Sequence, residues 1–261
     1  MARAALAVHR WDATPAEAKE IQIRLRDRME RDDRISAIRK VAGADLALVL
    51  EGRRSWANGR GKAIAGMIVY EFPEMKEMER VSCEQTLTFP YVPGLLSFRE
   101  IPALLAAFAK LHNAPDLIFC DGLGYAHPRR FGLASHLGVL LDLPSVGVAK
   151  SLYIGEHGEL HHRQGSTAPL IDPDGGETIG AALRTVDGVK PVYVSQGHRI
   201  SLARAIELTQ AVSEGYRIPK PTREADHYVN ALRRAKNSGT ADAAAAGAPR
   251  AKARAADKTR E

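Results

Sequence analysis

The stretch 116–150 constrains the fold of this chain more than any other part of the sequence. The apolar run 116–120 predicts a buried strand, and a second apolar run at 145–149 predicts another. Between them, the apolar stripe along 131–141 predicts a helix, which ends before Pro144. Strand, helix and strand at this spacing predict a parallel β-α-β crossover, and therefore an α/β fold.

Charged side chains stand at the ends of both predicted strands. Asp121 closes the first strand, next to a glycine that can turn sharply, and His127 follows soon after. Lys150 closes the second strand. Because open α/β sheets place their sites at the carboxyl edge of parallel strands, we expect an acid, an imidazole and an ammonium group to meet there.

Three further strands are predicted ahead of this crossover, at 38–50, 63–72 and 78–86. Their short connections favour an antiparallel meander. Asp45 lies in the middle of the first of these strands, where an unpaired acid costs several kcal/mol. A salt bridge or a place near a sheet edge would explain it, but a second acid at a strand end, Asp121, favours a functional role.

The segment 89–94 predicts a stiff turn. Two prolines fix the backbone and Gly94 allows an abrupt exit, so Tyr91 and Val92 are held on a rigid projection. Ser97 is predicted to cap a helix over 98–111, with Glu100 at the spacing of a capping box. That spacing alone gives Glu100 a complete structural explanation.

The remaining predicted elements flank this core. A helix over 16–31, capped by Thr14, is expected to pack on the sheet, and 152–173 is expected to be irregular with surface histidines. A hairpin around Asp187-Gly188 joins strands at 178–185 and 191–195, and Ser201 caps a helix over 202–213. Thr222 is predicted to cap a last helix that carries Glu224 and Asp226 in its first turns.

The charge of the chain is concentrated at one end. The net charge is +6, and 233–261 holds eight basic and three acidic residues, which leaves about +1 for the rest. This basic tail suits a polyanionic partner or serves as a solubilising extension. We therefore expect one domain over 1–236 and a disordered basic tail over 237–261.

Composition also limits where the protein works. No apolar run approaches the ~20 residues of a membrane span, and the N-terminal apolar stretch is too short for a signal peptide. Cys83 and Cys120 lie in predicted strands and are expected to be buried, reduced thiols. We expect a cytoplasmic protein without a membrane partner.

Four acids stand out for chemistry: Asp45, Glu100, Asp121 and Asp226. Hard divalent cations such as Mg²⁺ and Mn²⁺ take oxygen ligands and leave room for a phosphate. That the four acids converge on one site is a prediction from the expected topology alone. A serine hydrolase is not indicated, because no GxSxG motif follows a predicted strand.

Several long segments resemble one known family, endonuclease V. The segments are PYVPGLLSFRE (90–100), DGLGYAHPRRFGLASHLGVLLDLPSVGVAKSL (121–152), VYVSQGHRISLARAIELT (192–209) and YRIPKPTREAD (216–226). The resemblance runs from Trp11 to about Arg234. The order of the elements is similar to a ribonuclease H-like fold, with three antiparallel strands, then parallel strands, flanked by helices.

The resemblance implies a catalytic centre and a metal site. Asp45 and Asp121 look like the metal-binding aspartates, Glu100 like an acid that reaches the metal directly or through water, and Asp226 like a further metal-side acid. His127 and Lys150 look like catalytic groups near the scissile phosphate. The implied cofactor is Mg²⁺, with Mn²⁺ as a substitute.

The resemblance also implies how a lesion is read. Tyr91, Val92, Pro93 and Gly94 match a wedge that separates the strands, and Leu96, Gly122 and Gly147 fall where the family lines its base pocket. Leu123 departs from a position that is often polar in the family, so contacts at the pocket edge are expected to differ.

The implied activity is DNA repair by a monomer. The family cuts the second phosphodiester bond 3′ of deoxyinosine, leaving 3′-hydroxyl and 5′-phosphate ends, and other deaminated or mismatched bases are further expected targets. The alternatives are an inosine-specific ribonuclease, a branched-DNA nuclease on the same fold, and a binder without catalysis. The four acids argue against the last.

Overall fold

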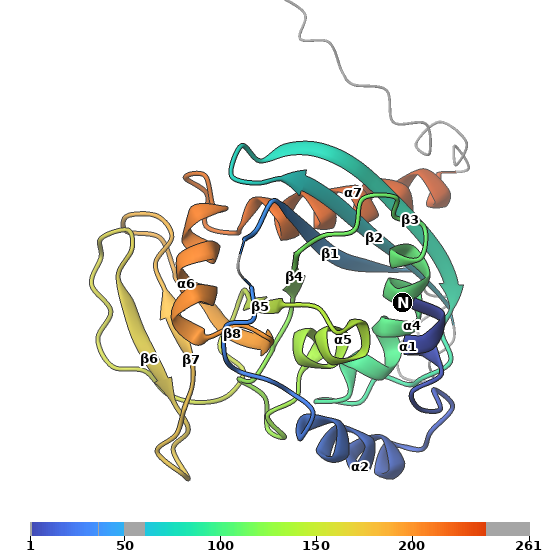
Figure 1. Cartoon of the computed structure of the whole chain (residues 1–261), viewed down its shortest axis with the longest axis horizontal. Helices are drawn as coiled ribbons and strands as arrows, with labels where there is room; N and C mark the ends of the chain where they lie inside the picture. The colour runs from blue at the N-terminus through green and yellow to red at the C-terminus, as the bar shows by residue number, and fades with distance from the viewer. Residues whose placement is uncertain (1, 36, 50–60, 239–261) are drawn as a thin grey trace, which may run out of the picture.

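An eight-stranded mixed sheet forms the centre of the molecule, with the strand order β3-β2-β1-β4-β5-β8-β7-β6 (Figure 1). The computed structural model describes residues 2–35, 37–49 and 61–238. The predicted tail was 237–261. Its first two residues belong to the last helix, which ends at Asn237 and is capped by Ser238, and the rest of it lies outside the described residues. The α/β, ribonuclease H-like class expected from the sequence is confirmed.

The first three strands form the predicted antiparallel meander. They are β1 (Lys40–Val49), β2 (Lys62–Glu71) and β3 (Lys76–Thr86), each paired with the next. Strand β2 is buried along almost its whole length, because the sheet is covered on both faces there.

The predicted crossover is β4 (Leu117–Asp121), α5 (Leu133–Leu141) and β5 (Ser145–Ala149). Strand β4 runs parallel to both of its neighbours, β1 and β5. Its first four residues are fully buried, so Asp121, the last residue of β4, is the only residue of this strand with solvent exposure.

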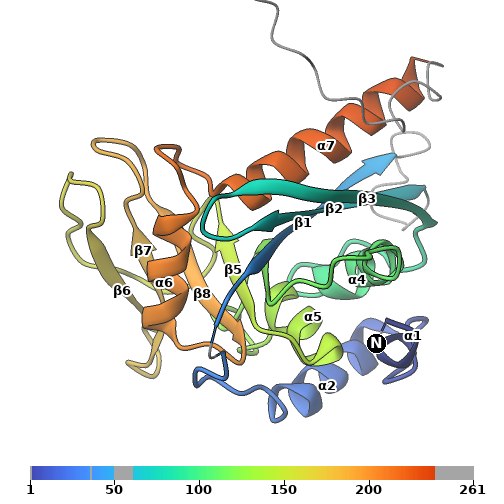
Figure 2. The same cartoon turned by 45° about the horizontal axis from the view of Figure 1, so that its top comes forward.

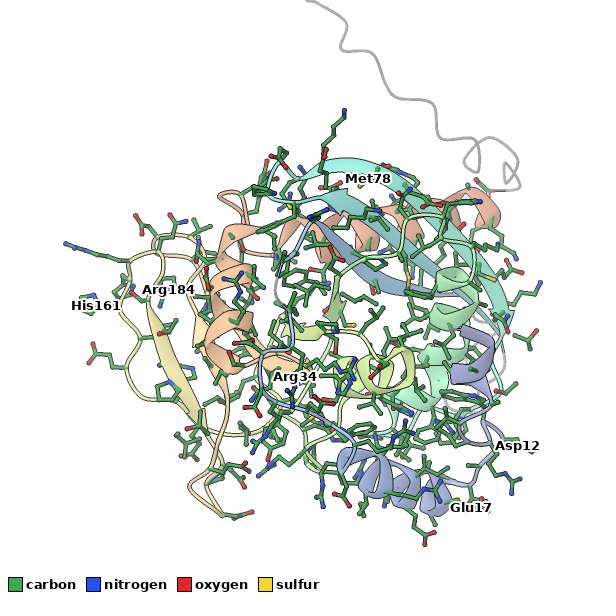
Figure 3. The ribbon with its side chains drawn as sticks, in the orientation of Figure 1. Asp12, Glu17, Arg34, Met78, His161 and Arg184 are labelled. Carbon is green, nitrogen blue, oxygen red and sulfur yellow. The ribbon has the colours of Figure 1, made fainter. Side chains whose placement is uncertain are left out.

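The far half of the sheet is antiparallel. It consists of β8 (Val192–His198), β7 (Thr178–Leu183) and β6 (Thr167–Ile171). The β7–β8 hairpin was predicted, but the expectation that 152–173 is irregular was wrong at β6. Only Ala168 and Leu170 are buried in this edge strand, and a proline lies between them, so the alternation is too short to predict a strand. Figure 3 shows His161 at the outer margin beyond this strand, exposed as expected.

Helices cover both faces of the sheet (Figure 2). On one face lie α4 (Leu96–Phe108) and α5, with the short α1 (Ala2–Leu6) and α2 (Pro15–Arg26) outside them. On the other face lie α6 (Leu202–Ala211) over β8 and α7 (Lys220–Asn237) across β1 and β2. None of the described helices is both long and apolar enough to cross a lipid bilayer.

Two predicted helix caps are confirmed and two were wrong. Thr14 and Ser201 each accept a backbone N–H at a helix start, as expected. Ser97 instead lies inside α4, where its hydroxyl contacts His136 Nδ1 at 3.0 Å, so Glu100 belongs to no capping box. Helix α7 begins at Lys220, two residues before the predicted cap Thr222, whose hydroxyl donates to the Pro219 carbonyl. Both cysteines are free thiols, and both were expected to be buried. Cys120 is fully buried as expected, whereas Cys83 is only partly buried.

Candidate active site

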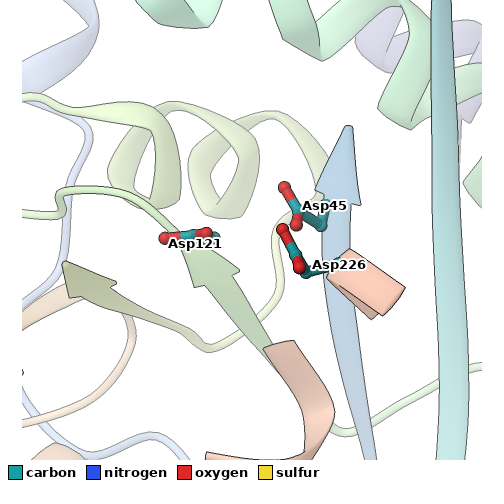
Figure 4. A group of neighbouring side chains, drawn as sticks. All are labelled: Asp45, Asp121 and Asp226. Carbon is teal, nitrogen blue, oxygen red and sulfur yellow. The ribbon is translucent and has the colours of Figure 1, made fainter. Parts of the chain in front are cut away.

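Three aspartates from three elements meet at the carboxyl end of β4 (Figure 4). Asp45 comes from the middle of β1, Asp121 is the last residue of β4, and Asp226 lies on α7. Because β1 and β4 are parallel neighbours with Ala44 opposite Cys120, the next residue of each strand is brought to the same level. One carboxylate oxygen from each aspartate lies within 4.8 Å of those of the other two.

Helix α7 reaches this cluster because β1 carries a glycine where the two elements touch. A Cβ added at Gly43 would lie 1.9 Å from the carbonyl oxygen of Pro221, in the first turn of α7. The start of α7 is therefore in direct contact with the β1 backbone, and Asp226 faces the sheet edge little more than one turn later.

The cluster is a site of concentrated negative charge. Burial, followed by repulsion from Asp121, raises the pKa of Asp45 well above its usual range. The Leu46 N–H donates to Asp45 Oδ1 at 2.7 Å and offsets only part of this. Burial, and then repulsion from Asp45 and Asp121, raises the pKa of Glu100 to about 8.

Lys150 balances part of this charge from the end of β5. Its Nζ lies 2.5 Å from Asp121 Oδ2 and 3.6 Å from Asp226 Oδ1. Burial lowers the pKa of Lys150, but the hydrogen bond to Asp121 and the surrounding carboxylates outweigh this effect and leave it above its ordinary value. The ammonium group is therefore charged and close to any phosphate that the cluster would bind.

The aspartate cluster fits a hard divalent cation. All of its donors are carboxylate oxygens, and the three aspartates are half-buried. Because the ionised carboxylates repel one another, a bound cation would lower the electrostatic energy of the cluster. Glu100 lies outside the three-aspartate group, but it lines the same cavity as Asp45 and Asp121. The residues present could therefore hold a metal ion, with Glu100 to one side of it.

A cavity of about 460 Å³ opens beside the carboxylates. Its lining includes the predicted wedge residues Tyr91, Val92, Pro93 and Gly94, together with Leu96, Gly122, His127 and Lys150. Gly147 does not line it. A Cβ at Gly147 would lie 2.4 Å from the Gly124 nitrogen, so this glycine lets the turn after β4 pack against β5.

His127 lies in the cavity wall, and both of its ring nitrogens contact the backbone of this chain. Its Nε2 lies 3.0 Å from the Gly94 carbonyl, and the backbone N–H of Arg129 donates to Nδ1 at 3.2 Å. Burial, and then the nearby Arg129 charge, lowers the pKa of His127 to about 4, so the ring is neutral at physiological pH.

Tyr153 and Gln22 are among the cavity residues that the sequence did not predict. Tyr153 lines the mouth and is half exposed, and nothing in its sequence context indicated this. Gln22, on α2, is 1% exposed and also lines the cavity. A signal for Gln22 was present, because an amide stands among the apolar residues of the buried stripe, which contains Ala18, Ile21 and Leu25.

Comparison with known proteins agrees with this arrangement. The family model described as Endonuclease V matches residues 22–227. Endonuclease V of Nostoc punctiforme is 46% identical over 224 residues, which cover 85% of this chain and 97% of that protein. The crystal structure of endonuclease V from Streptomyces avermitilis has a TM-score of 0.78 and 43% identity, covering 88% of this chain and 96% of that one.

A further similar structure contains a nucleic acid. It is Ciona intestinalis endonuclease V in complex with a 24mer DNA containing an inosine followed by a ribo-adenosine. Its TM-score is 0.71 at 29% identity, with 84% of this chain and 97% of that chain covered.

Fold and site together define a class of protein, the nucleases that gather carboxylates at the edge of a ribonuclease H-like sheet. Within that class, the chain belongs to the endonuclease V family. It is therefore an endonuclease, which hydrolyses phosphodiester bonds within a nucleic acid strand.

Proposed function

We propose that this endonuclease repairs DNA that contains deoxyinosine, the product of adenine deamination. It hydrolyses the second phosphodiester bond 3′ of the lesion and leaves 3′-hydroxyl and 5′-phosphate ends. The observation that carries the proposal is that two aspartates of the cluster, Asp45 and Asp121, line the same cavity as the projecting turn 91–94. Other deaminated or mismatched bases are secondary targets, because a weakened pair is easier to open.

Asp45, Asp121 and Asp226 are proposed to hold Mg²⁺, which Mn²⁺ can replace, with Glu100 as a further ligand, directly or through water. When bound, the ion lowers the pKa of a water molecule and stabilises the charge that develops at phosphorus. The all-oxygen donor set supports this choice over softer metals.

The side chains around the cluster have separate tasks. The Lys150 ammonium offers a positive charge to the phosphate, because it already lies against Asp121 and Asp226. Glu100 lines the cavity with Asp45 and Asp121, where its carboxylate offers a further oxygen donor beside the reacting groups. His127, which was predicted to be a catalytic group, lies in the wall of the same cavity.

Lesion recognition is assigned to the turn 91–94 and the adjacent pocket. Tyr91 is 37% exposed on this turn and is proposed to fill the space that a flipped base leaves. Flipping costs a few kcal/mol, and an inserted ring offsets part of it. Leu96 and Gly122 line the pocket that receives the base, and Gly147 supports it from behind.

A nicking assay tests the proposal. The protein is incubated with Mg²⁺ and either a duplex containing one deoxyinosine or the same duplex without it. We expect a nick in the lesion strand alone, and equal nicking of the undamaged duplex would remove the claim of lesion specificity.

The matched variant is Asp121→Ala. It removes one metal ligand, and we expect no cutting while circular dichroism and some DNA binding are retained. Turnover by this variant would exclude Asp121 from the reaction.

Inosine-containing RNA is a second proposed substrate. The observation in its favour is that the DNA bound by the Ciona protein carries a ribonucleotide directly after the inosine. Competing cleavage of matched DNA and RNA strands measures the preference. A branched-DNA substrate is less well supported, because a narrow wedge suits one displaced base better than a junction.

We also propose that the enzyme acts as a monomer in the cytoplasm. Folding of a single copy of the chain already brings the aspartate cluster and the turn 91–94 together, so the proposed site needs no residue from a second copy. The two free cysteines fit a reducing compartment.

A further inference from the structure

Three side chains converge on one backbone oxygen at the base of the wedge turn. The carbonyl oxygen of Gly94 lies 3.2 Å from Gln22 Nε2 and 3.0 Å from His127 Nε2, and it accepts a hydrogen bond from Arg129 Nη2. A carbonyl oxygen has two lone pairs, so three donors saturate it. The turn is therefore held from three directions at a single atom.

Gln22 links the three segments that meet there. Its Oε1 accepts from Arg129 Nε at 2.6 Å, and its Nε2 donates both to Gly94 and to the Phe131 carbonyl, each at 3.2 Å. Because arginine can only donate, the contact with Arg129 fixes which end of the amide is oxygen. All polar atoms of this buried side chain are thus used, and each contacts a segment that borders the cavity.

The ring of His127 has one defined tautomer in this arrangement. Its Nδ1 accepts the backbone N–H of Arg129, so the hydrogen must be on Nε2, which donates to Gly94. Both ring nitrogens are used by the protein itself. The ring of His127 therefore contacts the wedge turn directly, through the Gly94 carbonyl.

The turn that carries His127 and Arg129 is anchored on its other side. Arg130 forms ion pairs with Asp172 and with Glu177, the latter at 3.1 Å, and Glu177 also accepts the hydroxyl of Tyr125. Arg130 itself has a left-handed backbone, φ 56°. These contacts join the turn to the β6–β7 end of the sheet, so the turn provides a fixed support for the wedge.

Gly94 is itself suited to this position. Its φ of +76° is in the left-handed region, and an added Cβ would lie 2.8 Å from Arg129 Nη2. A side chain here would strain the backbone and would push the guanidinium group away from the carbonyl.

From this geometry we infer that Gln22, His127 and Arg129 are positioning residues that set the height of the wedge turn above the carboxylates. Helix α2, which otherwise only packs on the fold, thereby controls strand separation. The inference rests on the proposed function, since it concerns the wedge of that same site. It predicts a dependence on substrate form, because only a duplex must be opened, whereas an inosine in a single strand is already accessible.

The test compares Gln22→Leu with the wild type on a duplex and on a single strand, each containing one deoxyinosine. Leucine keeps most of the volume but cannot hold Gly94 or Arg129. We expect kcat/KM on the duplex to fall about tenfold or more, since a displaced group of about 1 Å can cost ~100-fold. Cleavage of the single strand is expected to fall less than about threefold. Arg129→Met, a half-buried position, is expected to show the same selective loss and carries the test if Gln22→Leu does not fold.

Two controls separate positioning from general destabilisation. Ile23→Ala changes an exposed neighbour on the same helix, and Leu208→Ala weakens the core under α6, far from the wedge. Both should leave the ratio of duplex to single-strand cleavage unchanged. Equal losses on the two substrates in Gln22→Leu and Arg129→Met, or no loss on either, would overturn the inference. Failure of the wild type to cut either inosine substrate would instead overturn the proposed function.

Discussion

At the scale of single residues, the centre is organised by carboxylates that repel one another. Asp45 and Glu100 both have raised pKa values, caused first by burial and then by neighbouring acids. The protein without metal is therefore strained by its own site whenever these groups are ionised. This is a cost of holding carboxylates ready for a cation.

This strain predicts how stability depends on pH in the presence of a chelator. Groups with a raised folded pKa bind more protons in the folded than in the unfolded state, so the free energy of unfolding falls as pH rises through the interval. For Glu100 that interval runs from its ordinary 4.5 to about 8. We expect the melting temperature of the chelated wild type to fall across this range more steeply than that of Asp45→Asn. Parallel curves for the two proteins would contradict this.

Residue identity was easier to predict than residue surroundings. Asp45 and Asp121 were predicted because an acid in or at the end of an apolar strand is conspicuous, and parallel strands share an edge. Ser97 was placed wrongly because its buried contact with His136 joins two helices that only the tertiary fold brings together. Gln22 was missed for the same reason, since its three partners lie 72 to 109 positions away.

At the scale of elements, the contact between β1 and α7 decides whether Asp226 reaches the cluster. The sequence predicted the helix and its acid, but not that Gly43 permits the close approach. Strand β6 was missed because a five-residue edge strand with a central proline has almost no periodic signal. The longer elements were predicted from their own residues, whereas the contact between β1 and α7 and the short edge strand β6 depend on the tertiary fold.

The contact makes a specific prediction for Gly43→Ala. The new methyl group would meet the Pro221 backbone, which cannot rotate aside, so α7 must shift away from β1. We expect a loss of about 1–3 kcal/mol of stability and weaker binding of Mg²⁺. Thermal melting and metal titration measure both.

The matched control is Gly158→Ala, where an added Cβ meets nothing within 4 Å. This variant should melt and bind metal like the wild type. If Gly43→Ala binds metal as tightly as the control does, the start of α7 does not set the position of Asp226.

At the scale of the whole molecule, metal binding should stabilise the fold, because the ligands come from β1, β4 and α7 and assemble only when these pack together. Saturating Mg²⁺ at about 100 times its Kd should add roughly 2.7 kcal/mol to the free energy of unfolding. Scanning calorimetry of the wild type and Asp121→Ala measures this. An equal shift in the two proteins would place the metal elsewhere.

The C-terminal tail makes a separate prediction. Residues 239–261 contain five basic and three acidic residues and few large apolar ones. Removing them should leave the melting temperature within about 2 °C, because such a segment adds little to a core. The slope of log K for DNA against log salt should become shallower by about 1 or more, as phosphate contacts are lost. An unchanged slope would leave the tail without a role in binding.

The most direct test of the central claim is to map the cut on a duplex with one deoxyinosine and a label at either end of the lesion strand. With Mg²⁺, the account predicts a single break at the second phosphodiester bond 3′ of the lesion, with a 3′-hydroxyl and a 5′-phosphate. Breaks at several positions, or a break on the 5′ side, would contradict the assignment of wedge, pocket and carboxylates to one lesion-reading site.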